Sequence, residues 1–363
     1  RFELEPADPQ SASARPLHLL FIHGVASSTW GSFGDLWSAD RRAELDALQR
    51  AYGDHALAYE YATLTRSPIE SALLLAAELE ALPEGTRLHL VTHSSGGLIG
   101  ELICRAGAVQ PVTAGGAGPR PTLAAAPFSP EEHRLFERGG PALAAQAKLL
   151  RRLDERLSAL GRKAIRVERL VRVACPALGT TLASGRLDRW LAVFGNLAGT
   201  ALPDSPLADM SKDIGDFMAA VVKQRTDPAA LPGLAALMPD STLIQLINWP
   251  TARVDGDLAV IAGDIDPDAW WTRLLVWVTD RFYDGDHDLV VNTPSMYGGA
   301  KRSGRSVASF HKGPSVNHFR YFQNPESARR LAQALTAPAA DEPEGFEPLR
   351  KPTVDIARAI VPR

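Results

Sequence analysis

Cysteine and long apolar runs are scarce in this sequence of 363 residues, and each scarcity excludes a class of protein. The two cysteines, Cys104 and Cys175, cannot build a disulfide framework and lack the spacing of metal ligands. No apolar run reaches the roughly 18 residues of a membrane-spanning helix. An excess of positive charge is also missing, because 39 Lys and Arg face 42 Asp and Glu, which argues against a nucleic-acid-binding protein. The length instead suits one large α/β domain with an insertion.

Residues 88–99 form the most informative segment, an apolar run that leads straight into Ser94 and then into small residues. A strand that turns sharply into a helix lifts a serine hydroxyl above the edge of a sheet and presents it as a nucleophile. Such a turn tolerates only small neighbours, and Gly96 meets that demand. The usual Gly-x-Ser-x-Gly pattern has Thr92 in place of its first glycine, and the same frame set on Ser95 would place a histidine there. We therefore predict Ser94 as the nucleophile, with an ordinary serine- and glycine-rich turn as the alternative.

A second turn follows residues 17–22, an apolar run rich enough in bulky side chains to be a buried strand. The chain continues into His23, Gly24 and Val25 and then into a loop of small residues. Acyl transfer needs two backbone N–H groups aimed at the developing oxyanion, one after the nucleophile and one from a loop of this kind. The predicted donors are the amides of Val25 and Ser95, and we expect His23 to brace the loop rather than to act as a base.

A nucleophilic serine also needs a general base, and the late part of the chain offers two histidines. Residues 306–310 read as a strand, and a helix is predicted to open near Pro325. His318 lies between the two, so it can reach back over the edge of the sheet toward Ser94. The alternative is His311, at the edge of the strand itself. The topology favours His318.

The acid that orients the base is expected on a loop between the two preceding strands, and two aspartates compete for this role. Asp266 follows a strand predicted at 257–262, on a loop that starts at residue 263, and Asp288 closes an acidic turn. That turn alternates aspartates like the start of a calcium loop. It lacks the glycine that such a loop needs at its sixth position, and Ser295 stands at the twelfth, where a glutamate belongs. No metal site is predicted.

Taken in order, these segments resemble the motifs of the α/β-hydrolase superfamily, in its lipase and esterase branch. Residues 23–24 are similar to the family's oxyanion motif, and residues 93–97 to its nucleophile motif. Residues 288–295 resemble the Asp-Gly-Leu-Val-x-Thr-x-Ser segment that carries the acid in bacterial triacylglycerol lipases. Residues 316–318 resemble the Met-Asn-His segment that carries their base. The resemblance implies a serine, aspartate and histidine triad, and of the two aspartates it favours Asp288.

The resemblance covers residues 17–335 in pieces, including 175–180, which are similar to the family's Thr-Pro-His-x-Gly-Ser segment. The sequence departs from the family pattern at Thr92, which replaces a glycine, at Ala177, which replaces the usual histidine, and in a long insertion. What the resemblance implies is an α/β-hydrolase fold, with a mostly parallel central sheet flanked by helices and a helical cap or lid insertion.

Hydrophobic patterning agrees with alternating helices and strands, which is typical of a parallel sheet with its site at the carboxyl ends of the strands. It predicts a helix at 68–82, a helical stretch at 129–162 and a strand at 166–174. From these patterns we divide the chain into three parts. They are an α/β-hydrolase core of residues 1–110, 164–186 and 249–338, helical cap or lid insertions at 111–163 and 187–248, and a surface tail or linker at 339–363.

Aromatic residues concentrate in and near the second predicted insertion, where Trp190 and Phe194 stand at its start and Trp270 and Trp271 follow it. One interpretation is a hydrophobic wall for an acyl chain. The alternative is a buried helix packed on the sheet, because aromatic side chains at helical spacing commonly belong to a core.

The sequence therefore predicts a serine carboxylic-ester hydrolase that acts on a small-molecule or lipid ester with a hydrophobic acyl group, without a metal or organic cofactor. An amidase, a thioesterase or an acyltransferase would use the same machinery. A different class of function is a non-catalytic, hydrolase-like interaction module of a larger protein. Neighbouring domains in a longer chain are compatible with the sequence. The sequence given opens at Arg1 without a charged-then-apolar signal segment, which says little about export. The location is left open, with the cytoplasm favoured.

Overall fold

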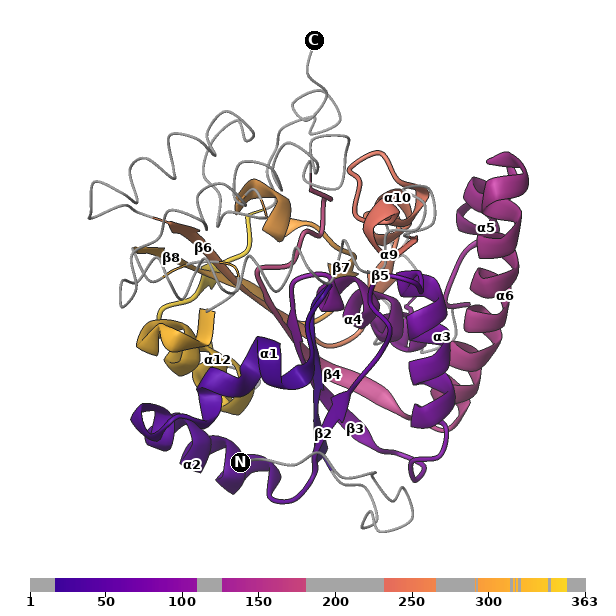
Figure 1. Ribbon diagram of the computed structural model, residues 1–363. Helices are drawn as coiled ribbons and strands as arrows, with labels where there is room; N and C mark the ends of the chain where they lie inside the picture. The colour runs from indigo at the N-terminus through magenta and orange to yellow at the C-terminus, as the bar shows by residue number, and fades with distance from the viewer. Residues whose placement is uncertain are drawn as a thin grey trace, which may run out of the picture.

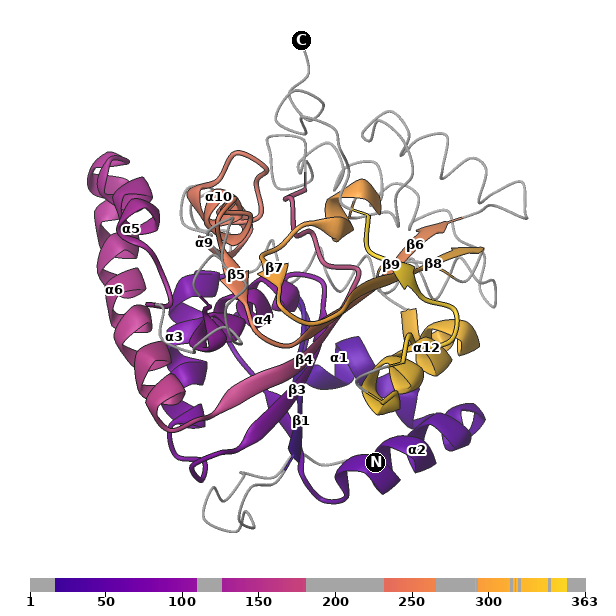
Figure 2. The same ribbon diagram turned by 180° about the vertical axis from the view of Figure 1, so that it is seen from behind.

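The computed structural model describes residues 17–109, 126–180, 232–265, 291, 293–313, 316, 318, 321–338 and 341–350. Within them, seven strands form one sheet in the order β2-β1-β3-β4-β6-β8-β9, in which all neighbours are parallel except β8 and β9 (Figures 1 and 2). The strands are β1 (Leu17–Ile22), β2 (Ala56–Tyr59), β3 (Arg87–His93), β4 (Arg166–Val173), β6 (Asp257–Ile265), β8 (Ser306–Gly313) and β9 (Glu347–Pro348). A small second sheet pairs β5 (Arg253–Val254) with β7 (Lys301–Arg302).

Helices cover both faces of the sheet, as Figures 1 and 2 show. One face carries α2 (Arg42–Tyr52) and α12 (Pro325–Thr336), which contact each other. The other carries α3 (Pro68–Leu79), α4 (Gly96–Cys104) and α6 (Gly140–Arg162), with α3 between α4 and α6. Shorter helices are α1 (Thr29–Phe33), α5 (Pro130–Glu137), α9 (Pro232–Ala235) and α10 (Thr242–Ile247), and 3₁₀ turns lie at η2 (Gly34–Trp37), η3 (Ala39–Arg41), η4 (Arg105–Gly107), η7 (Thr293–Tyr297) and η8 (Tyr321–Gln323).

The predicted fold class is confirmed, because the chain folds as a mostly parallel sheet between helical layers in the manner of an α/β-hydrolase. Because the sheet is covered on both faces, β3 is buried except at Arg87, and β4 is buried except at Arg166 and Glu168 near its start. The helix predicted at 68–82 begins at Pro68, where the Ser67 side chain caps the helix by accepting a hydrogen bond from the Glu70 N–H. The strand predicted at 166–174 is β4.

Two predicted strands and one predicted helical stretch differ from the structure. β6 continues to Ile265, so the loop predicted from residue 263 begins later, because β8 pairs with it as far as Gly313. His311 therefore lies inside β8 rather than at its edge. The helical stretch at 129–162 is two helices, α5 and α6, and the break falls at Gly140, whose φ of +72° suits glycine and few other residues.

The predicted division into core, insertions and tail stays a prediction, but two described segments bear on it. α6 belongs to the first predicted insertion and runs along the outside of α3 (Figures 1 and 2). Residues 341–350 belong to the predicted tail, and their strand β9 pairs antiparallel with β8. No helix within the described ranges is both long and apolar enough to cross a membrane.

The strand register brings the site's segments together at one edge of the sheet. Ile22 of β1 is level with Thr92 of β3, and His93 of β3 is level with Val173 of β4. Because these strands are parallel, the chain leaves all three of them at the same edge. The turns that follow β1 and β3, predicted as the oxyanion loop and the nucleophile turn, are therefore neighbours in space.

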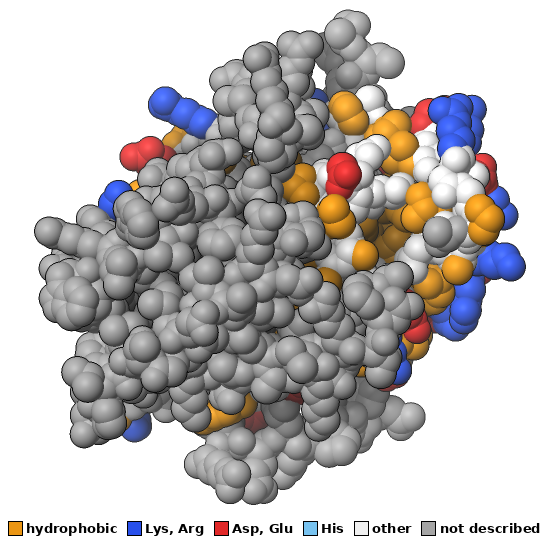
Figure 3. Space-filling view, turned by 45° about the horizontal axis from the view of Figure 1, so that its top comes forward, with side chains coloured by type: hydrophobic (Ala, Val, Ile, Leu, Met, Phe, Trp, Pro, Cys, Tyr) orange, Lys and Arg blue, Asp and Glu red, His pale blue; other side chains and the backbone are white. Residues whose placement is uncertain are grey.

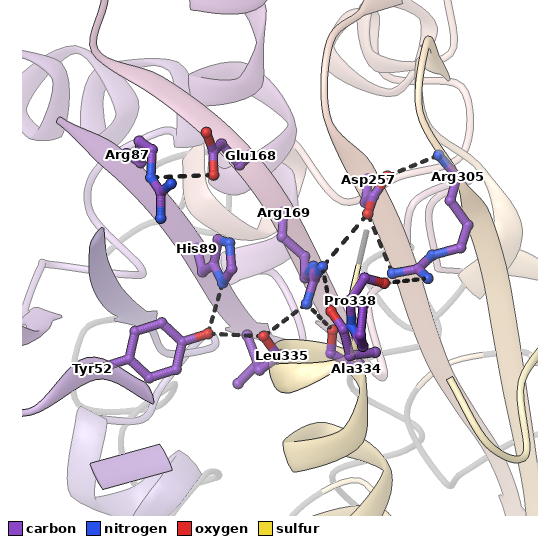
Figure 4. Close-up of polar contacts among 11 residues, drawn as sticks. Tyr52, Arg87, His89, Glu168, Arg169, Asp257, Arg305, Ala334, Leu335 and Pro338 are labelled. Carbon is purple, nitrogen blue, oxygen red and sulfur yellow. Dashed lines mark hydrogen bonds and ion pairs between the residues drawn. The ribbon is translucent and has the colours of Figure 1, made fainter. Parts of the chain in front are cut away.

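A buried polar cluster holds α12 at the opposite edge, as Figure 4 shows. Arg169, near the start of β4, donates hydrogen bonds from Nη1 to the carbonyl oxygens of Ala334 (2.8 Å) and Leu335 (2.7 Å). The Tyr52 hydroxyl bonds Nδ1 of His89 (2.6 Å) and donates to the same Leu335 oxygen (3.2 Å). A cation at the carboxyl end of a helix satisfies carbonyl groups that have no partner within the helix. These hydrogen bonds fix the carboxyl end of α12 to the sheet. The amino end of α12 follows the segment that carries His318.

Candidate active site

Ser94 occupies a sharp turn between β3 and α4, with a left-handed φ of +52° that is uncommon outside glycine. Its N–H donates to the Val173 carbonyl at 2.9 Å, which fixes the turn to the next strand. The glycines after it have no room for a side chain. A Cβ on Gly96 would lie 2.4 Å from the Ile22 carbonyl oxygen, and one on Gly97 would lie 2.3 Å from the Cys175 sulfur. The turn has the geometry predicted from residues 88–99.

The side chain of His318, which follows β8 in the chain, contacts the side chain of Ser94. Its Nε2 lies 2.8 Å from the Ser94 Oγ, a hydrogen-bond distance, and both side chains are buried. A base within hydrogen-bond reach of a serine hydroxyl is the arrangement needed to remove its proton. The structure thus brings together the nucleophile and the base that the sequence predicted.

The alternative base, His311, makes its hydrogen bonds elsewhere. Its Nε2 bonds the Ser309 hydroxyl on β8 (2.9 Å), and its Nδ1 bonds the Ser327 hydroxyl on α12 (3.3 Å). Burial, and after it the charge of Arg330, lowers the pKa of His311 to about 4. Both ring nitrogens are engaged, Nε2 within β8 and Nδ1 at the contact between β8 and α12, which is a structural role.

The loop after β1 packs directly against the nucleophile. A Cβ on Gly24 would lie 2.7 Å from the Ser94 Cβ and 3.3 Å from its Oγ. The amides on either side of Val25 are bonded to side chains, Gly24 N–H to the Ser32 hydroxyl (3.3 Å) and Ala26 N–H to the Thr63 hydroxyl (2.9 Å). Within the part of the chain that the structure describes, the Val25 N–H itself has no acceptor.

The Ser95 N–H, at the start of α4, likewise has no acceptor among the described residues. Buried amides of proteins are rarely left without an acceptor. Two such amides flanking a serine hydroxyl, one from each turn, are the donor pair that binding of an oxyanion requires.

Three residues that follow strand ends brace the loop after β1. His23, fully buried, lies with Nε2 3.2 Å from a Glu60 carboxylate oxygen and with its ring stacked on Tyr61. The Tyr61 hydroxyl donates to the His23 carbonyl (2.7 Å). Glu60 also accepts the Thr29 N–H at the start of α1 (2.7 Å). The His23 imidazole and the Thr29 hydrogen bonds, against the effect of burial, lower the pKa of Glu60 to about 2. His23 therefore occupies the bracing position expected of it.

Glu60 and Tyr61 are not identified in the sequence analysis, although a signal for them exists. They follow β2, which pairs with β1 in parallel, so residues after both strands reach the same edge. A short strand predicted at 56–59 would have placed them beside His23. Asp264, near the end of β6, was not identified as a candidate site residue because the sequence predicts a loop from residue 263. It is buried and pairs with the Lys312 ammonium at 2.9 Å.

Neither predicted acid can be placed, because Asp288 and its alternative Asp266 lie outside the described residues. The four predicted substrate-pocket residues, Trp190, Phe194, Trp270 and Trp271, lie outside them as well. Across the described ranges, no three His, Cys, Asp or Glu side chains are grouped in a way that could hold a metal ion. Figure 3 brings the top of Figure 1 forward and shows hydrophobic side chains around a hollow on the right of that face.

Comparison with known proteins gives a family match over most of the chain. The profile of a family described as a domain of unknown function, DUF7379, matches residues 2–126 and 146–336. No curated protein matches the sequence.

Among solved structures, similar folds occur in bacterial lipases and esterases. Lipase 1 from Pelosinus fermentans is 16% identical over 88% of this chain and 99% of its own, with a TM-score of 0.40. EstA from Clostridium botulinum is 12% identical over 94% of this chain and 93% of its own, with a TM-score of 0.47. The Staphylococcus hyicus lipase is 14% identical over 88% and 92%, with a TM-score of 0.43.

Proposed function

The chain belongs to the DUF7379 family, a domain of unknown function, and we propose that it is a serine hydrolase that cleaves carboxylic esters. The observation that carries the proposal is the 2.8 Å contact between the Ser94 hydroxyl and Nε2 of His318, at a strand-to-helix turn. The amides of Val25 and Ser95, which have no acceptor among the described residues, come from the turns on either side of that hydroxyl and support the same proposal.

In the proposed mechanism, the Ser94 Oγ attacks the ester carbonyl carbon while Nε2 of His318 takes its proton. The carbonyl oxygen becomes an oxyanion and accepts the N–H groups of Val25 and Ser95. His318 then gives the proton to the leaving alkoxide, which departs as an alcohol and leaves an acyl-serine. Water, deprotonated by His318, attacks the acyl carbon, and the serine leaves with the returned proton. Each amide donor of this kind contributes about 10²–10³-fold in rate.

The third member of the triad is assigned by sequence alone. We propose Asp288 as the acid that accepts a hydrogen bond from Nδ1 of His318, and Asp266 as the alternative. The acid fixes the tautomer in which Nε2 is free to accept the serine proton and stabilises the imidazolium that results. We further propose a hydrophobic acyl group for the substrate, because the sequence places four aromatic residues in or near the second insertion.

Thioesters, amides and acyl transfer to an alcohol use the same sequence of steps and remain alternatives for the substrate. A non-catalytic interaction module is the alternative of a different class. The Ser94–His318 contact disfavours it, since a scaffold has no need for a serine hydroxyl bonded to a histidine at such a turn.

The proposal is tested with a fluorophosphonate probe, which labels activated serines, and with p-nitrophenyl esters from acetate to palmitate. We expect the wild type to be labelled, Ser94→Ala to lose labelling and ester hydrolysis, and the control Ser38→Ala, between η2 and η3, to keep both. The dependence of the hydrolysis rate on the length of the ester's acyl chain then defines the acyl group that the enzyme prefers. Labelling that persists in Ser94→Ala, or a folded wild type that is never labelled, contradicts the proposal.

A further inference from the structure

His93, the last residue of β3, makes polar contacts with the segment that carries His318 and with α1, which follows the loop after β1. Its Nε2 lies 2.8 Å from the backbone carbonyl oxygen of His318, and its Nδ1 lies 3.1 Å from the hydroxyl of Ser32. The imidazole is buried, with 5% of its surface exposed. Its partners come from parts of the chain that are 225 and 61 residues away.

The chemistry of its partners shows that one ring nitrogen of His93 must carry a hydrogen. A carbonyl oxygen only accepts, so Nε2 of His93 carries a hydrogen and donates it to His318. The hydroxyl of Ser32 bonds Nδ1 on one side and accepts the Gly24 N–H on the other. A continuous chain of hydrogen bonds therefore leads from the oxyanion loop through Ser32 and His93 to the backbone of the base.

Aromatic neighbours hold the His93 ring in place. Phe33 of α1 meets it edge-on at 6.3 Å between ring centroids, and Tyr321 of η8 lies at 6.4 Å. The ring of His318 itself lies at 5.2 Å. A ring packed from several sides loses little further freedom when it makes its hydrogen bonds. The donor at Nε2 is thus presented in a fixed direction.

On the basis of the proposed function, we propose that His93 is a positioning residue, which holds the base loop and the oxyanion loop in register with the nucleophile. The Nε2–H anchors the backbone of His318, and the side chain of His318 reaches the Ser94 hydroxyl from that anchored point. Proton transfer and attack depend on such placement, and a displacement of about 1 Å costs about 10²-fold in rate. The same imidazole connects to the loop after β1 through the Ser32 hydroxyl, so one side chain links both segments of the proposed site.

Three variants separate positioning from general stability. His93→Leu removes both hydrogen bonds, and His93→Asn keeps a polar group only at the level of Nδ1. His93→Gln extends an amide N–H to the level of Nε2 and can restore the bond to His318. The matched control is His311→Gln, since His311 is also buried and bonded at both ring nitrogens but links β8 to α12. All four proteins are first compared with the wild type by thermal unfolding.

We expect the Leu and Asn variants to lower the fluorophosphonate labelling rate and kcat for p-nitrophenyl acetate by about 10–100-fold, with KM changed by less than about 2-fold. We expect His93→Gln to recover most of that loss and His311→Gln to match the wild type. Amide hydrogen exchange supplies a readout without activity. Peptides that contain His318 should exchange faster in the Leu and Asn variants and at the wild-type rate in the Gln variant.

The outcomes for the two proposals are distinct. A wild type that is never labelled contradicts the ester hydrolase, while hydrogen exchange at His318 still decides whether His93 fixes that segment. The second outcome is a wild type that is labelled, together with Leu and Asn variants that are labelled just as fast and show unchanged hydrogen exchange at His318. This outcome overturns the positioning role alone. A loss of rate shared equally by His93→Gln and His93→Leu overturns it too, since the restored N–H would then have no effect.

Discussion

Gly24 shows, at the scale of a single residue, how closely the loop after β1, the predicted oxyanion loop, approaches the predicted nucleophile Ser94. A Cβ at this position would stand 2.7 Å from the Ser94 Cβ, which is a rigid part of the serine side chain. We expect Gly24→Ala to move the loop or the serine and to slow fluorophosphonate labelling by about 100-fold. The overpacking should lower the free energy of unfolding by about 1–3 kcal/mol, measured by denaturant titration.

Gly107, in η4, provides the matched control for this substitution. A Cβ there would lie 3.5 Å from the Asp255 Cβ, an ordinary van der Waals contact. Gly107→Ala should leave the labelling rate at the wild-type value. Equal labelling rates in the wild type and Gly24→Ala would show that the loop does not press on Ser94.

At the same scale, the sequence predicts the residues whose roles depend on neighbours along the chain. Ser94 could be found because a strand, a serine and small residues follow one another in one short segment. His93 and Glu60 were not assigned their contacts, because each acts across strands. Glu60 bonds Thr29 from 31 residues away, and His93 bonds a carbonyl 225 residues away. Contacts of that range depend on strand order, which a single sequence does not state.

At the scale of elements, β2 and α1 meet through Glu60, and this contact makes the stability of the oxyanion loop depend on pH. The pKa of Glu60 is about 2 in the folded chain, against an ordinary value of 4.5. A lowered pKa means that the ionised form is stabilised by folding. The stabilisation is fully present above pH 4.5 and is lost as the pH falls from 4.5 through 2.

We therefore expect the wild type to be more stable than Glu60→Gln by a constant amount above about pH 5, and the difference to shrink toward zero near pH 2. The measurement is the free energy of unfolding of both proteins across this range. Glu84→Gln removes an exposed carboxylate from the turn between α3 and β3 and serves as the control. A difference that stays constant down to pH 2 would contradict the assigned role of Glu60.

Element boundaries were less predictable than the elements themselves. β1 matches its prediction because a nearly continuous apolar run defines it, and β4 ends one residue before its predicted end. β6 and β8 extend beyond their predicted ends because the two strands pair with each other, from Ser306 opposite Leu258 to Gly313 opposite Ile265. The polar residues Asp264 and Lys312 in those extensions read as loop residues, yet they face each other as an ion pair. Pairing between neighbouring strands decides such ends, and hydrophobic patterning does not report it.

At the scale of the whole molecule, a buried charged cluster joins α4 to the sheet and to the segment that leads into β8. Glu101 of α4 accepts hydrogen bonds from Arg172 of β4 (2.9 Å) and Arg302 of β7 (2.7 Å), and all three side chains are almost wholly buried. Arg172 also donates to the carbonyls of Met296 and Gly298. Burial by itself would raise the pKa of Glu101, but the two arginines outweigh it and lower the pKa. The carboxylate is therefore ionised and compensates two guanidinium groups.

Removing that single negative charge should destabilise the whole fold, because two buried arginines would lose their counter-charge. We expect Glu101→Gln to lower the free energy of unfolding by about 3–5 kcal/mol, measured by denaturant titration. Glu168→Gln is the matched control, since Glu168 also faces two arginines, Arg87 (3.4 Å, Figure 4) and Arg166 (3.5 Å), but at the surface. Glu168→Gln should lower the free energy of unfolding by no more than about 1 kcal/mol, because water already screens those charges. Equal losses in the two variants would mean that burial adds nothing to the Glu101 cluster, and that other contacts hold α4 to the segment that precedes β8.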